Sequence, residues 1–211
     1  MVALSWLAIS VHAKVGTISI GELARASDLI LVAEVQRVEV KAGVKVARVR
    51  VIRFIKGEAE CPIAFVAEPT WTCDTSAAVP GERVMLYLTA AVDPQERTLN
   101  GKNVGAVQAW CKREGTQLYV LSHSGRGRIP LSLNKGQWVA PVTLGDGRGP
   151  GLNLNLYIPR PVATVLTSPG HRAVPLAELI SRSGLGHKLL DSQLNPSNRV
   201  CRVASEEPAG Y

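Results

Sequence analysis

The segment from Asp28 to Gly57 constrains the fold most, because two long valine-rich runs follow each other there with only a short turn between them. The first run, DLILVAEVQRVEV, has four consecutive apolar residues after its aspartate, and the second, VKVARVRVIRFIKG, alternates valines with basic residues. β-Branched side chains suit the pleated surface of a strand, and Ala42-Gly43 supplies the turn. The segment predicts two long strands and, since valine is the commonest apolar residue, an all-β chain.

The second run has two interruptions in its alternation that predict curved strands. The apolar phase slips by one residue between Val46 and Val49 and again around Ile52 and Phe54. A slip within a strand indicates a bulge, which bends the strand, and a small closed barrel needs tilted and curved strands. We therefore expect two bulges and a barrel. Basic side chains of this run are expected on its solvated outer face: Lys45, Arg48, Arg50 and Arg53.

Shorter apolar runs complete the expected barrel. Residues 62–67 and 81–90 read as strands, and Val104–Trp110 with Gln117–Ser122 read as a final hairpin around the turn Glu114-Gly115. Ser19 and Glu22 have the spacing of a capping box, which predicts a short helix from Ile20 to Ser27. Beyond residue 122 the patterns are weaker, with a short strand at residues 138–142, another at 152–158 and a short helix at 175–180.

The length of 211 residues fits one domain with additions. With 46% hydrophobic and 19% charged residues, the chain can form a core and is not disordered as a whole. We expect a signal peptide over residues 1–13, a barrel domain over 14–122, a partly irregular extension over 123–190, and a flexible tail over 191–211.

The N-terminus predicts export. Residues 2–13 are uncharged and apolar, and Val11-His12-Ala13 places small residues where a signal peptidase reads them. No basic segment precedes this run, so we expect the signal peptide to be truncated at its start. A buried first strand or helix is the alternative. A membrane span is not expected, because crossing takes about 20 apolar residues.

Four cysteines fit an oxidising compartment. No two of them form a CxxC pair, so neither a zinc ribbon nor a thioredoxin-type redox site is supported. An even count predicts two bridges with three possible connectivities. We expect Cys73 to pair with Cys111, because both lie at the edges of strand-like segments. Cys61 and Cys201 would form the second bridge or remain two free thiols.

Several of these strings occur in one order that we associate with a known family. ASDLILVAEV (26–35), ARVRVIRFIKG (47–57), Cys73, GERVMLYL (81–88) and Cys111 together resemble the netrin-like module, which is the OB-type barrel of the tissue inhibitors of metalloproteinases and of many exported bacterial proteins. The resemblance covers residues 18–122 and implies a five-stranded OB-like barrel. Those inhibitors place an N-terminal cysteine on the zinc of the protease. Here the expected mature start is Lys14 and the first cysteine is Cys61, so inhibition by that mechanism is not expected.

No motif for catalysis is present. The four histidines are far apart, and the sequence contains no HExxH, GxSxG or P-loop motif. His123 lies between Ser122 and Ser124, but adjacent residues at the end of a strand point to opposite faces. We therefore expect a module without catalysis, cofactor or metal, which is exported and acts by binding or inhibition.

The excess of 24 basic over 17 acidic residues, a net charge of +7, attracts anionic partners. We expect the partner to be a protein or an anionic envelope surface, contacted by Trp71 and Asp74 in one loop and by Arg126 and Arg128 after the last barrel strand. Trp71 packing over a Cys73 bridge is the alternative. Single-stranded nucleic acid or another anionic polymer in an OB groove is the alternative function. Against nucleic acid, the basic residues of the strands alternate with acidic ones.

Overall fold

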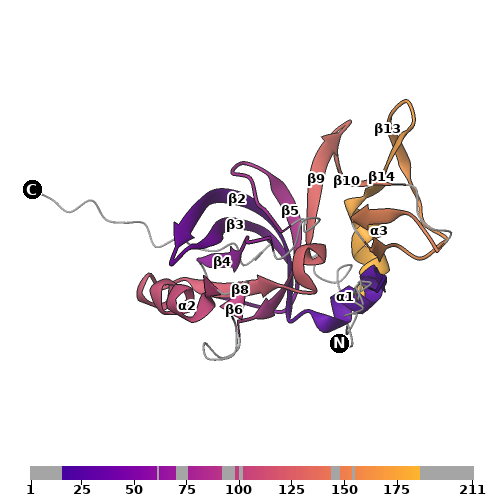
Figure 1. Cartoon of the computed structure of the whole chain (residues 1–211). Coiled ribbons are helices and arrows are strands. Elements are labelled where there is room, and N and C mark those ends of the chain that lie inside the picture. The colour runs from indigo at the N-terminus through magenta and orange to yellow at the C-terminus, as the bar shows by residue number, and fades with distance from the viewer. Residues whose placement is uncertain are drawn as a thin grey trace, which may run out of the picture.

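A computed structural model of the chain describes residues 16–60, 62–69, 76–91, 98–99, 102–143, 148–153 and 155–185. A barrel occupies one side of the molecule, and an extension of its sheet occupies the other, where the helices α1 (Ile20–Ala26) and α3 (Leu176–Ile180) lie close together (Figure 1). Within the described ranges, none of the helices has the length and apolar character needed to cross a membrane.

Five strands form the barrel. They are β2 (Leu29–Lys41), β3 (Val44–Lys56), β4 (Ile63–Val66), β5 (Arg83–Ala90) and β8 (Gln117–Leu121). Their order is β5-β2-β3-β4-β8, and pairing of β5 with β8 closes the sheet. Neighbours are antiparallel except for the parallel pair of β4 and β8. The expected all-β, five-stranded OB-like barrel is confirmed.

The long hairpin of β2 and β3 has the predicted turn but not both predicted bulges. Ala42 and Gly43 have φ of 49° and 76°, as a tight two-residue hairpin turn requires. The slip around Ile52 is confirmed, since Arg53 pairs with Val32 but Val51 with Ala33. The bulge predicted between Val46 and Val49 is wrong in its placement. The extra residue there lies in the partner strand β2, between Val35 and Arg37.

Burial on both faces of β3 explains the misplaced bulge. Val46 packs in a cluster outside the barrel, and Ala47 packs inside it with Val49 and Val51. Adjacent residues of a strand point to opposite faces, so two buried neighbours can occur without any bulge. The change in apolar phase therefore reflects burial of Val46 under a second layer outside the barrel. It does not reflect a bulge in β3.

That second layer is the helix α2 (Val104–Arg113), where the sequence predicted a strand over residues 104–110. Val104, Val107 and Cys111 are buried on one face of α2, which is the spacing of a helix. The helix ends in a Schellman motif, in which Thr116 N–H donates to the Cys111 carbonyl at 2.8 Å and Gly115 N–H to the Lys112 carbonyl at 3.2 Å. Gly115 has a φ of 60°. The strand prediction was wrong because it followed the strand propensity of Val104 and Val107 and not their helical spacing.

The chain after residue 122 continues the barrel sheet. A short turn of 3-10 helix, η1 (Ser124–Gly127), leads from β8 into β9 (Arg128–Asn134), which pairs with the first half of β5. Three further strands extend the sheet in the order β10 (Gln137–Val142), β14 (His171–Pro175) and β13 (Val165–Ser168). The strand predicted at residues 138–142 and the short C-terminal helix, now α3, are confirmed.

Smaller elements complete the described part. β1 (Ile18–Ser19), β12 (Leu156–Tyr157) and β11 (Gly151–Asn153) form a three-stranded sheet, and β6 (Thr98–Leu99) pairs with β7 (Lys102–Asn103). The π-helical turn η2 (Ser181–Leu185) follows α3.

Strands β2 and β5 separate two cores. On one face, Leu31 and Leu86 pack inside the barrel. On the other face, Ile30, Met85 and Tyr87 pack against α1, α3 and the extension. Both faces of the two strands are therefore buried, which explains their continuous apolar sequences. The Tyr87 hydroxyl lies 2.7 Å from Ser183 Oγ in η2, and burial raises the pKa of Tyr87 well above its usual value.

The helix α1 is fixed at both ends. At its start the predicted capping box is confirmed, with Ser19 N–H donating to Glu22 Oε2 at 2.8 Å. At its end, Lys56 Nζ donates to the carbonyl of Ala24 at 2.9 Å and also to that of Ser27. The next residue, Gly57, has a φ of 73°, and a Cβ there would lie 2.6 Å from the carbonyl oxygen of Asp28. Lys-Gly at the end of β3 thus holds α1 on the barrel.

Candidate functional site

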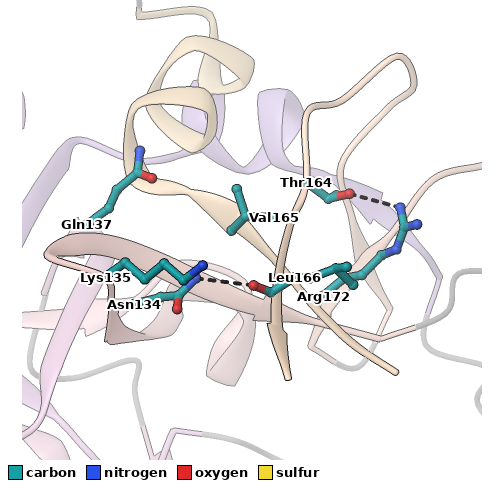
Figure 2. A pocket seen from close by; sticks show the side chains of 7 residues that line it. All are labelled: Asn134, Lys135, Gln137, Thr164, Val165, Leu166 and Arg172. Atoms are coloured by element: carbon teal, nitrogen blue, oxygen red, sulfur yellow. Dashed lines mark hydrogen bonds between the residues drawn. The ribbon is translucent and has the colours of Figure 1, made fainter. Parts of the chain in front are cut away.

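A hollow of about 540 Å³ lies between the tip of the β9–β10 hairpin and strand β13. We call it the hairpin hollow and define it by seven lining residues. They are Asn134, Lys135, Gln137, Thr164, Val165, Leu166 and Arg172. Figure 2 shows the three residues of the β9–β10 hairpin on one side and Thr164, Leu166 and Arg172 on the other, with Val165 between them. The hollow thus brings together segments about 30 residues apart in the sequence.

The hollow forms where strand β14 leaves the sheet before the neighbouring hairpin ends. β14 pairs with residues 139–142 of β10, and after Pro175 the chain turns into α3. Gln137 and Trp138 continue β10 in pairing with β9 alone. The hairpin closes through Lys135-Gly136, whose φ angles of 49° and 79° suit a two-residue turn. The hairpin tip therefore projects past the last residue of β14 and forms one wall.

Two hydrogen bonds fix the walls. Asn134 Nδ2 donates to the carbonyl of Leu166 at 3.4 Å and connects the two hairpins across the hollow (Figure 2). Arg172 Nη1 donates to Thr164 Oγ1 at 3.1 Å. Lys135, Gln137 and Arg172 are exposed. The lining therefore offers two cations, two amides and one hydroxyl, groups that can bind and orient a ligand.

The segment that contains the hollow carries most of the net positive charge of the chain. Residues 123–172 hold six basic side chains and one acidic side chain, so they supply five of the seven net charges. Residues 14–122 hold 14 basic and 12 acidic side chains. The one acidic residue of the segment, Asp146, lies outside the described residues. In the described part, neither Lys135 nor Arg172 has an acidic partner.

The barrel neutralises its own charge. Glu39 pairs with Arg37 at 3.3 Å, Lys41 at 3.6 Å and Arg48 at 3.1 Å. Glu34 pairs with Arg50 at 2.7 Å. The prediction of a solvated outer face is wrong for Arg48, whose side chain is 12% exposed. The helix α2 covers it, and its guanidinium lies over the ring of Trp110 at 4.8 Å.

Two of the predicted partner contacts make hydrogen bonds within the protein, and one of them, Arg128, is buried. Arg128 is 7% exposed and donates through Nε to Glu82 Oε1 at 3.0 Å. Arg126 Nη2 donates to the carbonyl of Gly16 at 3.0 Å, and burial lowers the pKa of its guanidinium. Their position directly after the last barrel strand was the basis of the prediction. That position lies where the chain crosses from β8 to β9, and there Arg128 connects β9 to Glu82, the residue before β5, so its side chain is buried.

Of the four cysteines, Cys111 is the one in the described part of the chain. Trp71, Asp74, Cys61, Cys73 and Cys201 lie outside the described residues. Cys111 is buried in α2 as a free thiol, and its burial raises the thiol pKa. The Cys73–Cys111 bridge stays a prediction.

The sequence cluster around His123 has a structural explanation. Ser122 is buried, and its hydroxyl lies 2.9 Å from Ser27 Oγ and 2.7 Å from Thr89 Oγ1. His123 has a φ of 51° at the start of η1. Ser122 thus connects β8 to α1 and β5. Among the described residues, no group of three or more histidine, cysteine or acidic side chains could hold a metal ion.

No family model and no curated protein matches the chain. The class of protein is therefore defined by the fold and the hollow: it is an OB-like barrel with a basic extension of its sheet.

Sequence reasoning missed every residue of the hollow. The absence of acidic residues across 123–172, apart from Asp146, was the signal that could have located the region.

Proposed function

We propose that the chain is an exported, non-catalytic binding module whose partner is an anionic polymer of the cell envelope, contacted by the basic extension of the barrel sheet. One observation carries the proposal: five of the seven net positive charges come from residues 123–172. An excess of one sign of charge in one part of a chain produces a field that attracts a polyanion, and of the six basic side chains there only Arg128 is buried. Export rests on the apolar N-terminal run alone.

The paired charges of the barrel support the same choice over nucleic acid in an OB groove. Arg48 and Arg50 would have to leave Glu39 and Glu34 to contact a phosphate backbone. Lys135 and Arg172 need to break no ion pair that the described part contains. A polyanion would therefore bind the extension at lower cost than the barrel.

The barrel is the part of the chain to which the proposed netrin-like resemblance applies. Strand order and the Lys56-Gly57 pair that holds α1 support it, because both fall on residues that carry the resemblance. The described resemblance ends at residue 122, so the basic extension lies outside it.

The experiment is binding of the purified chain to immobilised alginate, a polymer of uronic acids, with neutral dextran as the negative reference. The test variant removes three exposed charges of the extension: Lys135→Gln, Arg160→Gln and Arg172→Gln. The control variant removes three charges of the barrel: Arg37→Gln, Lys45→Gln and Arg53→Gln. Each basic side chain near an anionic surface contributes about 1 kcal/mol. The test variant should bind at least about 30-fold more weakly, and the control should bind within a few-fold of the unaltered chain.

Salt and a second polymer complete the test. Binding to alginate should weaken steeply as sodium chloride rises, because counterions are released. Equal binding by the test and control variants would reject the extension as the contact. Tighter binding of oligothymidylate than of alginate, lost in the barrel variant, would replace the proposal with the nucleic-acid alternative.

A further inference from the structure

We infer that the hairpin hollow is a binding site for an acidic sugar, a saccharide unit that carries a carboxylate. The inference deepens the proposed function and rests on it, because it names the unit of the polymer that the extension would recognise. Volume, the chemistry of the lining and the fixed walls each support it.

The volume is larger than a single small anion needs. Sites for small molecules usually measure about 300–1,000 Å³, and the hollow of about 540 Å³ lies within that range. A carboxylate alone would leave most of this space to water. One or two sugar rings would occupy it.

The lining matches a carboxylate beside hydroxyl groups. The guanidinium of Arg172 has a planar set of donors that fits a carboxylate in a bidentate manner, and only one of its five donors is given to Thr164 in the described part. The amides of Asn134 and Gln137 both donate and accept, as sugar hydroxyls require. Val165 offers an apolar surface to the C–H face of a ring.

Two exposed leucines, one in the lining and one beside Asn134 in the sequence, make a lipid bilayer the competing partner of this region. Leu133 is 60% exposed and Leu166 is 66% exposed, and both could enter the interface of an anionic membrane. The hollow, which Leu166 lines, also carries the amides of Asn134 and Gln137, which would lose their hydrogen bonds to water in an apolar phase. The concave and polar lining therefore favours a saccharide over a lipid surface.

Two hydrogen bonds restrict the lining before a ligand binds. Thr164 holds Arg172 against its own hairpin, and Asn134 connects the two walls. Fixed side chains lose less conformational entropy when a ligand binds. A short acidic oligosaccharide should therefore bind measurably by itself, without the multiple contacts of a polymer.

The test titrates the isotope-labelled full chain with digalacturonate, with maltose as the neutral match, and follows backbone amide shifts. Digalacturonate should move the amides of residues 134–137 and 164–172 with a dissociation constant of about 1 mM or tighter, and maltose should not. The variant Arg172→Gln should weaken binding about tenfold or more. The control Lys45→Gln removes an exposed charge of the barrel, outside the lining, and should change binding by no more than about twofold.

Three outcomes would overturn the inference. If maltose moves the same amides as strongly as digalacturonate, the hollow does not recognise the carboxylate. No shift at about 10 mM digalacturonate, in a chain that still binds alginate through the extension, would reject the hollow and leave the proposed function standing. Binding to phosphatidylglycerol vesicles that is lost in Leu133→Ser/Leu166→Ser, and is not competed by digalacturonate, would assign the hairpin tips to a membrane. If alginate binding itself does not depend on the extension, the proposed function fails first.

Discussion

Replacing Lys56 by methionine tests how α1 is held on the barrel. The substitution keeps the length of the aliphatic chain and removes the ammonium group, which donates to the carbonyls of Ala24 at 2.9 Å and of Ser27. These carbonyls lie at the C-terminal end of α1, where a cation is favourable and where no further turn of helix provides a donor.

The expected cost follows from the bonds lost. A hydrogen bond to a charged group contributes about 1.5–3 kcal/mol, and the cation at the helix end adds about 0.3–1 kcal/mol. Because Lys56 is only half-buried, we expect Lys56→Met to lower the free energy of unfolding by about 2–3 kcal/mol. For a protein of this size, that loss corresponds to a Tm lower by roughly 4–12 °C.

Urea unfolding followed by circular dichroism measures the difference, with Lys45→Met as the matched control. Lys45 lies in the same strand β3, is exposed, and its ammonium makes no hydrogen bond within the described residues. The control should change stability by less than about 0.5 kcal/mol. Hydrogen exchange of the α1 amides should quicken in Lys56→Met and not in the control. Coinciding unfolding midpoints for the two variants would refute the role of Lys56.

Three other expectations can be measured on the same protein. Gly57→Ala should cost about 2–4 kcal/mol in urea unfolding, because it adds a backbone clash to a positive φ. Gly43→Ala, with a similar φ but open space around its Cβ, should cost about 1 kcal/mol. The contribution of Tyr87 to stability should be constant below about pH 10 and fall as the pH rises further, because its folded pKa is raised above its unfolded value of about 10; a Tyr87→Phe variant that shows the same alkaline loss would contradict this. Iodoacetamide should modify Cys111 only after unfolding, and modification that also needs a reductant would instead reveal the predicted bridge to Cys73.

Local patterns predicted the elements whose signals are local. The capping box of Ser19 and Glu22, the Ala42-Gly43 turn and the register slip near Ile52 depend on residues close in sequence or on a single hairpin, and the structure has all three. The helix α2 was also encoded locally, by the spacing of its buried residues and by Gly115. The sequence prediction missed this helix because the valines of α2 favour a strand by propensity, although their spacing favours a helix.

The residues of the hollow could not be predicted from local patterns. Asn134 and Leu166 meet only because β14 ends at Pro175 and the neighbouring hairpin does not. Neither segment has an unusual sequence by itself. Arg128 shows the converse problem, since a basic residue expected at the surface is buried by its partner Glu82, which lies 46 residues earlier in the chain.

The position of β5 between two cores limits how the chain can be shortened. A chain ending at Ser122 would keep the five barrel strands but lose β9, which leaves the first half of β5 with an open edge. It would also expose Ile30, Met85 and Tyr87 to water. An open edge beside apolar side chains recruits strands from other molecules. The smallest piece expected to fold as a monomer therefore reaches at least to η2, and a shorter piece is expected to self-associate.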